Sequence, residues 1–365
     1  MYRPWSILLA ASFVVACGSD DATTTSTTST GGSGTGTGVG GSGGSGAAGG
    51  MGGEGGTSEY VPTPEDIGFM ALAPVPTGEQ ILFNDWSVPD RIKSMAPDGS
   101  GVVDVFQTFR VWSMGVSQAG DRVAFACGDP EQEAHYGLTI GDAIQHTWLY
   151  DMDSETIEVA AYGNLNDECH HFSPSDDAVY VCRRYDFTPD GMFSGYRVGR
   201  IELPSFDFTW VAAREADFTL NPTVSPDGNT LWWTRIALPS QARTIETVAL
   251  PDGGPTVWRS DAHRPALSPD GQQIVFADIN DMSRLYVTDV NGTGTPVQVS
   301  DVAGTKPTWS PDGTRIAYVL WDDAAVCAHV EIVMADGSTA TTPDRIRDCS
   351  QTGEQITQLA WFVRP

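Results

Sequence analysis

The chain has 365 residues, of which 47 are acidic and 20 are basic, so its formal net charge is −27. A charge of this sign and size argues against binding to nucleic acid and against docking of a folded domain on anionic lipid. It does not identify a partner, because acidic surfaces also keep proteins soluble.

The first segment, Met1–Ala16, has the composition of an export signal. Arg3 supplies the positive start, and Ile7–Val15 supply an apolar stretch too short to span a bilayer. The sequence contains no second long apolar segment. An attachment near the N-terminus is therefore the one membrane contact that we expect.

The end of this segment, Val14-Val15-Ala16-Cys17, resembles the bacterial lipoprotein signal, in which a small residue precedes a lipidated cysteine. The resemblance implies that Cys17 is lipidated and becomes the first residue of the mature protein. In that family, Gly18 rather than Asp after the cysteine favours the outer membrane. An ordinary secretory signal and a chance cysteine are the alternatives.

The segment 17–58 begins with this cysteine and continues as a run rich in Thr and Ser and then in Gly. It has almost no large apolar residues, so it cannot bury enough surface to fold. We interpret it as a flexible linker with a mean span on the order of 35 Å. The folded domain is then expected over residues 59–365.

Within that domain a turn-like sequence recurs at roughly regular intervals. The fourth residues of the copies are 78, 120, 176, 228, 271 and 313, which gives steps of 42, 56, 52, 43 and 42 residues. Three copies read Ser-Pro-Asp-Gly and three are degraded. The copies are Val75–Gly78, Ser117–Gly120, Ser173–Asp176, Ser225–Gly228, Ser268–Gly271 and Ser310–Gly313.

Each copy is typical of a tight hairpin turn between two strands. Pro sets the second position of the turn, and Gly adopts the left-handed conformation that closes it. Alternating apolar residues follow, as in Arg315–Val319. A single hairpin cannot bury its own faces. Repeated units of four short strands therefore predict an all-β fold, a six-bladed β-propeller of four-stranded antiparallel blades.

In chain order, strands are predicted on both sides of each turn and in the outer half of each unit. The last segment, Ile356–Phe362, resembles a strand that precedes a turn, but no turn follows it. We predict that it pairs with the first unit and closes the ring. The outer strands that we expect are Arg91–Met95, Val102–Phe106, Thr147–Asp151, Ile157–Ala161, Leu285–Asp289 and Val297–Val299.

The segments Lys306–Tyr318 and Arg264–Asp289 carry the repeat most clearly: aromatic-Ser-Pro-Asp-Gly, aliphatic-x-aromatic, then Leu-Tyr-x-x-Asp in the second. This pattern resembles the TolB-type β-propeller repeat. The resemblance implies six blades and export to the periplasm. TolB has an additional N-terminal domain and binds partner proteins of the cell envelope; here the linker stands where that domain would be.

The predicted topology places the remaining cysteines and the histidines near one face, opposite the hairpin turns. Cysteines of exported proteins usually pair. Our first choice is Cys327–Cys349, at one end of the same unit, and the second is Cys169–Cys182, across a hairpin. Cys127 is a possible replacement for a member of either pair. The candidate ligand-binding face carries His135, His146, His170, His171 and His263.

Two motifs suggest metal sites, but each has a simpler interpretation. Cys169-His170-His171 offers ligand types that zinc prefers, yet neighbours along a strand point to opposite faces. Asp151–Glu155 resembles the start of a calcium loop but lacks its Gly and its distal Glu. We therefore expect no metal and no other cofactor, and no catalytic triad is evident.

These observations favour a non-enzymatic propeller on an envelope lipoprotein. It would bind an envelope protein or another ligand on its loop-rich face, which the insertions 128–145 and 183–195 would shape. The alternative is a periplasmic or surface hydrolase or lyase that acts on glycans or peptides at the central funnel. Convergence of histidines with carboxylates in that funnel would favour the enzyme.

Overall fold

The computed structural model of the chain describes residues 61–86, 90–128, 144–163, 165–185, 195–211 and 217–365. The export signal, the lipidation site Cys17, the linker and His135 lie outside the described residues. So does most of the two insertions that we expected to shape the loop-rich face.

Backbone hydrogen bonds join the described strands into five sheets. In sheet order, the first contains β1 (Met70–Ala71), β4 (Val103–Gln107), β3 (Arg91–Met95), β2 (Gly78–Asp85) and β25 (Leu359–Arg364). The second contains β5 (Val111–Val116), β6 (Arg122–Gly128), β7 (Gln145–Asp151) and β8 (Thr156–Ala161).

The third sheet has eight strands, and the last two sheets have four strands each. The third contains β9 (Asp167–Phe172), β10 (Ala178–Tyr185), β11 (Gly195–Glu202), β12 (Phe208–Trp210), β13 (Asp217–Val224), β14 (Thr230–Ala237), β15 (Arg243–Ala249) and β16 (Thr256–Ser260). The fourth contains β17 (Ala262–Leu267), β18 (Gln273–Asp278), β19 (Arg284–Asp289) and β20 (Val297–Ala303). The fifth contains β21 (Thr305–Trp309), β22 (Arg315–Asp322), β23 (Cys327–Met334) and β24 (Asp344–Arg347). Two short helices, η2 (Ile279–Asp281) and α3 (Cys349–Thr352), interrupt the strands.

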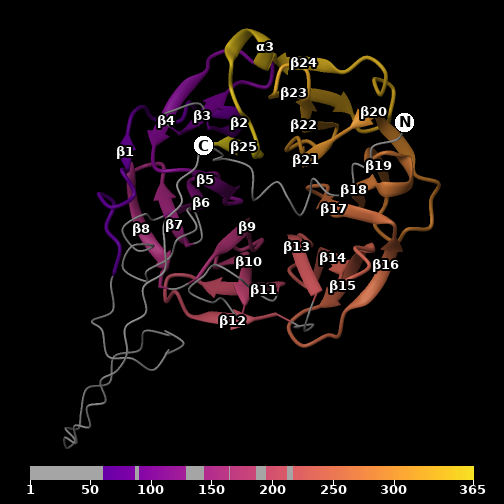
Figure 1. Cartoon of the computed structure of the whole chain (residues 1–365), viewed down its shortest axis with the longest axis horizontal. Coiled ribbons are helices and arrows are strands. Elements are labelled where there is room, and N and C mark those ends of the chain that lie inside the picture. Colours follow the sequence, from indigo (N-terminus) through magenta and orange to yellow (C-terminus); the bar gives the residue numbers. More distant parts are fainter. Residues whose placement is uncertain (1–60, 87–89, 129–143, 164, 186–194, 212–216) are drawn as a thin grey trace, which may run out of the picture. The chain divides into compact units, whose positions relative to one another are not determined.

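The sheets follow one another around a common centre in chain order (Figure 1). Their innermost strands contact each other in a closed cycle: β25, β5, β9, β13, β17, β21 and again β25. Apolar clusters fill the spaces between successive units; one, for example, joins Phe106 of β4 to Phe125 of β6. The domain is therefore an all-β propeller with four-stranded antiparallel blades.

The expectation of six separate blades is met only in part. Four sheets stand as separate blades, whereas the expected third and fourth units share the eight-stranded sheet. The short strand β12 pairs with Gly199–Ile201 and does not reach the other end of β11. There Tyr196 pairs with Phe218 of β13 in parallel, and Thr219 Oγ1 accepts from the Val198 N–H (3.1 Å).

The Ser-Pro-Asp-Gly sequences form the predicted hairpin turns. In the last one, Gly313 has φ 71°, and its N–H donates to the Ser310 carbonyl (2.8 Å). Ser310 Oγ donates to Asp312 Oδ1 (2.6 Å), which also accepts from the Thr314 N–H (3.0 Å). Only glycine adopts this φ without strain, so the turn sequence fixes where each hairpin reverses.

The predicted closure of the ring is confirmed. Strand β25 pairs antiparallel with β2 from Phe83↔Leu359 to Gly78↔Arg364. Trp361 lies between two units, where its Nε1–H donates to Glu79 (2.8 Å) and Arg315 stacks over its ring. The C-terminal strand thus covers the edge of β2 that would otherwise lack a partner.

Candidate functional site

The innermost strands β9, β13, β17 and β21 are each interrupted at the same place in the repeat. A register shift in their pairing leaves one residue out of the ladder, and that residue has a positive φ between 52° and 58°. The four residues are Cys169, Asn221, Arg264 and Lys306. Each lies seven residues before the fourth residue of its turn. These bulges lie toward the face opposite the Pro-Asp-Gly turns.

The side chains at these bulges reach toward the centre of the ring. Strands β9 and β21 are not neighbours in the cycle, yet Lys306 interacts electrostatically with Cys169, Cys182 and Glu168. Lys306 also repels Arg264 on the adjacent strand β17. An interaction between Lys306 and β9 must cross the ring, so these groups lie around its centre, a region that we call the central channel.

Three cations at this channel have no partner of opposite charge in contact with them among the residues that the structure describes. Twelve Arg and Lys residues of the described ranges form ion pairs. Arg110, Arg197 and Arg259 have other contacts. Within the described ranges, the charged groups of Arg243, Arg264 and Lys306 alone lack a hydrogen bond, an ion pair or a ring contact. All three are partly exposed.

The surroundings of these cations disfavour their charged forms. Burial, followed by repulsion from Arg243, lowers the pKa of Arg264 to about 10. Burial also lowers the pKa of Lys306, against the opposing attraction of Cys169 and Glu168. A cation that is desolvated without a partner is costly to the fold. An anion at this position would therefore relieve an electrostatic penalty that the folded protein carries.

A pair of thiols lies on the opposite wall of the channel. Cys169 and Cys182 are hydrogen-bonded to each other but form no disulfide. The predicted Cys169–Cys182 bridge is therefore wrong in this structure. The bulge is the reason: Cys182 pairs across the hairpin with Glu168, and Cys169 is the residue left out of register. The Cys182 hydrogen bond and the charge of Lys306 lower the pKa of Cys169, whereas burial raises that of Cys182.

The carboxylate of Glu168, next to Cys169 in the chain, is bound by groups of its own blade. Glu168 Oε1 accepts from the Tyr196 hydroxyl (2.7 Å) and lies 3.8 Å from Arg184 Nη2. Burial raises the pKa of Glu168. Glu168 therefore attracts Lys306 only from a distance and does not neutralise it.

His170 lies in a buried network between the second and third units. Thr147 Oγ1 donates to Asp167 Oδ2 (2.9 Å), so it accepts from His170 Nε2 (3.0 Å). His170 Nδ1 then accepts from Ser113 Oγ (2.6 Å). Arg183 binds both oxygens of Asp167 (2.6 and 2.7 Å). Burial lowers the pKa of His170 to about 4, and Ser113 is only 2% exposed, so this Ser–His pair has neither a strong base nor access to a substrate.

Three of the other described histidines, His146, His171 and His263, bond to separate neighbours, whereas His329 lies 3.3 Å from both Asp322 Oδ2 and Asp348 Oδ1 in the last unit. His171 Nε2 accepts from the Val224 N–H (3.3 Å), and His263 Nε2 contacts Ser283 Oγ (3.2 Å). His146 Nε2 contacts the Gly163 backbone. Burial lowers the pKa of His171 to about 4 and that of His263 well below its usual value. His146, His171 and His263 therefore do not converge with carboxylates in one funnel.

The remaining cysteines and the acidic motif Asp151–Glu155 contribute to the fold as a disulfide, a buried thiol and a turn. Cys327 and Cys349 form a disulfide with an S–S distance of 1.96 Å, and Cys127 is buried on β6. In the acidic motif, Asp151 Oδ1 accepts from the N–H groups of Asp153 (2.9 Å) and Ser154 (2.8 Å), which makes it a turn. No group of three or more His, Cys, Asp or Glu side chains suited to a metal occurs in the described part of the chain.

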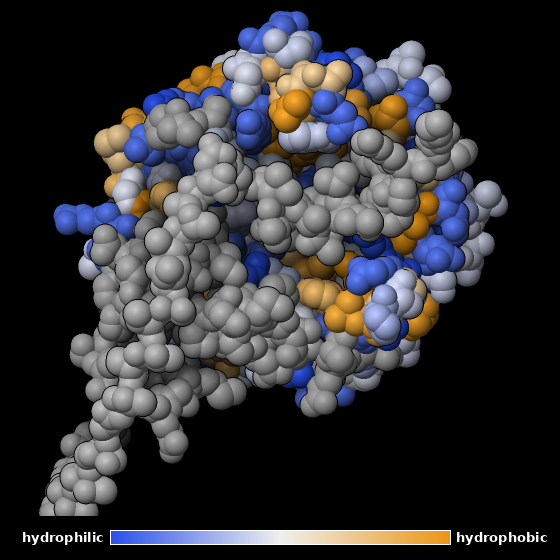
Figure 2. All heavy atoms as spheres, in the orientation of Figure 1, coloured by the Kyte–Doolittle hydropathy of each residue, from blue (hydrophilic) through white to orange (hydrophobic). Residues whose placement is uncertain are grey.

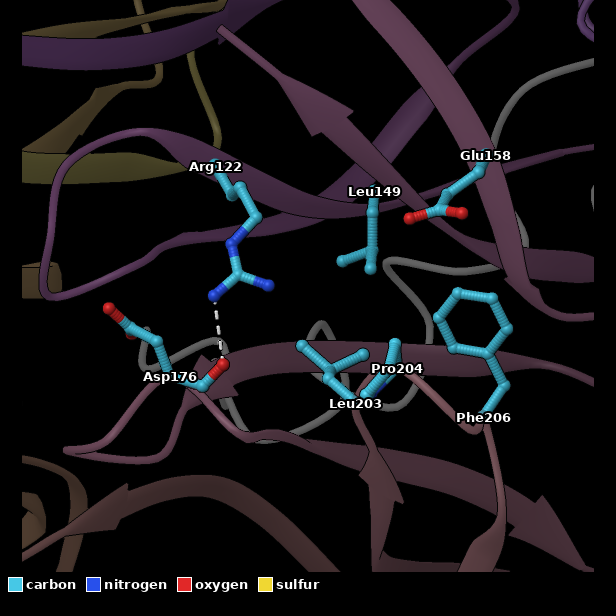
Figure 3. A pocket seen from close by; sticks show the side chains of 7 residues that line it. All are labelled: Arg122, Leu149, Glu158, Asp176, Leu203, Pro204 and Phe206. Atoms are coloured by element: carbon cyan, nitrogen blue, oxygen red, sulfur yellow. Dashed lines mark hydrogen bonds between the residues drawn. The ribbon is translucent and has the colours of Figure 1, made fainter. Parts of the chain in front are cut away.

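A cavity of about 250 Å³ lies beside Asp176 of the third hairpin turn, and Figure 3 shows the residues that line it. Arg122 lines it and donates through Nη2 to the Asp176 carbonyl (2.8 Å). Leu149, Leu203 and Phe206 supply an apolar side. Glu158 adds a carboxylate, so the cavity has few polar side chains for specific recognition.

Among the described residues, the surface seen in Figure 2 has no single large apolar patch on the face that it shows. Apolar residues lie there in separate patches among hydrophilic ones (Figure 2). None of the described helices is both long enough and apolar enough to cross a bilayer. The central cations are therefore the more distinctive chemical feature of the domain.

The fold is similar to those of solved β-propellers. TolB from Acinetobacter baumannii matches with a TM-score of 0.59 at 15% identity, over 79% of this chain and 67% of that chain. A chain of the Nidogen/Laminin complex matches with a TM-score of 0.56 at 10% identity, over 78% and 99%. Putative TolB from Agrobacterium tumefaciens has a TM-score of 0.49 at 17% identity, over 72% and 87%.

The two likenesses with TM-scores above 0.5 establish the class of fold, a β-propeller of TolB type, and at such low identity they establish nothing further. No protein-family model and no curated protein matches the chain.

Sequence analysis did not identify Arg243, Arg264 or Lys306 as site residues. A signal was present for two of them, because Arg264 and Lys306 occupy the same position relative to their turns. A bulge that turns this position toward the centre is not visible in the alternation of apolar residues. Arg243 comes from the start of an outer strand and has no counterpart in the repeat.

Proposed function

We propose that this chain is a bacterial envelope lipoprotein whose propeller binds a ligand on its loop-rich face, where the central channel opens. The observation that carries the proposal is the cluster of three unpartnered cations at that end of the channel. The separate engagement of His170, His171 and His263 supports binding over hydrolysis or elimination. Lipid at Cys17 and the linker 17–58 would hold the domain at the outer membrane.

We also infer that the domain is built from six blades. The eight-stranded sheet contains two four-stranded halves, joined at the single parallel pair Tyr196↔Phe218. An apolar cluster packs the halves against each other, with Tyr180 and Val198 on one side and Leu231 and Trp233 on the other. Counting each half as a blade gives six in the ring, as the repeats predict.

Site-specific photocrosslinking in intact cells tests the binding proposal. A photoreactive residue at Met282, which is 67% exposed on the loop-rich side, should give crosslinked products. The same residue at Asp252, exposed on the turn side, is the matched control and should give few. Products only from Asp252, or none from either position, would contradict binding on the loop-rich face.

A further inference from the structure

The channel cations identify the chemistry of the ligand. We propose that Arg264 and Lys306, assisted by Arg243, form a binding site for a small oxyanion, a molecule that presents carboxylate or phosphate groups to the centre of the ring. This inference rests on the proposed binding function and adds the class of ligand to it.

The first support is the imbalance of charge at this one place. The chain as a whole carries a charge of −27, and its other described basic side chains have partners. Three like charges gathered without a counter-ion repel one another and are poorly solvated. Such an arrangement persists where a ligand supplies the missing charge.

The second support is the way the backbone holds the side chains. Arg264 has φ 56° and Lys306 has φ 52°, a conformation that costs free energy for residues other than glycine. Pairing resumes beyond each bulge, and the Arg264 N–H donates to Thr234 Oγ1 (2.8 Å) on the neighbouring unit. The two residues thus occupy matching positions on adjacent innermost strands, and their charged groups are close enough to repel each other.

The third support is the chemistry of the three groups together. Guanidinium groups bind carboxylate or phosphate through two parallel hydrogen bonds, and an ammonium adds a compact charge. The distant acidic surface does little to oppose binding, because charges beyond about 8 Å are screened at physiological salt. Glu168, the nearest carboxylate on the opposite wall, is already bound by Tyr196 and Arg184.

Calorimetric titration of the purified full chain in detergent tests the site, with citrate as the carboxylate probe and inorganic phosphate as the phosphate probe. At least one probe should bind saturably. Lys306→Met and Arg264→Met should each weaken that binding about tenfold or more, because each removes a charged hydrogen bond. Both variants should melt no lower than the wild type, since each removes an unpartnered charge. Citrate alone, phosphate alone or both would define the group preferred.

The matched control is Arg200→Met, which removes a cation that already pairs with Asp177 and Glu202. It should leave binding of the probe unchanged. The inference is overturned if neither probe binds, or if the three variants weaken binding equally. Failure here with strong crosslinking at Met282 would remove the oxyanion while leaving binding on the loop-rich face intact.

Discussion

At the scale of single residues, His170 shows how a potentially catalytic side chain can serve packing. Its two ring nitrogens are occupied by Ser113 and Thr147, and its charge would be buried between two units. The network also buries Asp167, which Arg183 neutralises. Each polar group is thereby satisfied, and the contact specifies how the units pack.

This burial predicts how stability depends on pH. The pKa of His170 is about 4 in the folded protein and about 6.5 when unfolded, so the unfolded chain binds the extra proton between these values. Above pH 6.5 His170 is neutral in both the folded and the unfolded chain, so the free energy of unfolding does not change with its protonation. The free energy of unfolding decreases by on the order of 1 kcal/mol per pH unit as the pH falls from 6.5 toward 4, because only the unfolded chain then binds the proton.

Denaturant unfolding of the wild type and of His170→Gln, repeated from pH 7 to about 4, measures this effect. The variant should be less stable at pH 7. Between pH 6.5 and 4 its stability should fall less steeply than that of the wild type, by the slope that corresponds to one proton. His171→Gln is a useful companion, because burial lowers the pKa of His171 equally. Parallel pH profiles for all three proteins would show that the histidines titrate normally in the fold.

At the scale of elements, the C-terminal strand β25 decides whether the ring is closed. It buries Trp361 and Phe362 and pairs along the length of β2. Removal of residues 355–365 should cost at least about 5 kcal/mol, because two large aromatic side chains and a full ladder are lost.

Thermal unfolding of the truncated protein checks this expectation. Val363→Ala is the control, since Val363 lies on the same strand but is 50% exposed and should change stability little. A truncated protein that melts with the wild type would show that β25 does not hold the ring.

The elements also show what the sequence could predict. Turn position follows from glycines such as Gly271 and Gly313, because their conformation is a local property. The closing strand was predictable because Ile356–Phe362 repeats the pattern of a first strand without its turn. The join between β11 and β13 was not predictable, since it depends on how little of β11 the short β12 covers.

The same distinction applies to the candidate site. Cys169 and Cys182 were expected near each other, and they are in contact. The bulge shifts the register by one residue, so Cys182 pairs with Glu168 instead of Cys169 and the two thiols stay free. The histidines were expected on one face, yet each described one bonds to different neighbours. Arg264 and Lys306 come together because the innermost strands of two successive units contact each other, and the alternation of apolar residues does not reveal the bulges that carry them.

At the scale of the whole molecule, a strongly acidic protein concentrates unpaired positive charge at the centre of its propeller. Exposed acidic side chains such as Asp98, Asp227 and Asp336 lie on the outer surface. The innermost strands carry Arg264 and Lys306 toward one another from adjacent units. The proposed class of ligand therefore depends on the binding of an anion in the central channel.

A crystal structure of the protein grown with bromide, a heavy anion that anomalous scattering locates, tests this claim most directly. We expect a bromide peak between the Arg264 guanidinium and the Lys306 ammonium at the centre of the ring. Density that instead pairs these cations with carboxylates of the chain, with no anion between them, would contradict it.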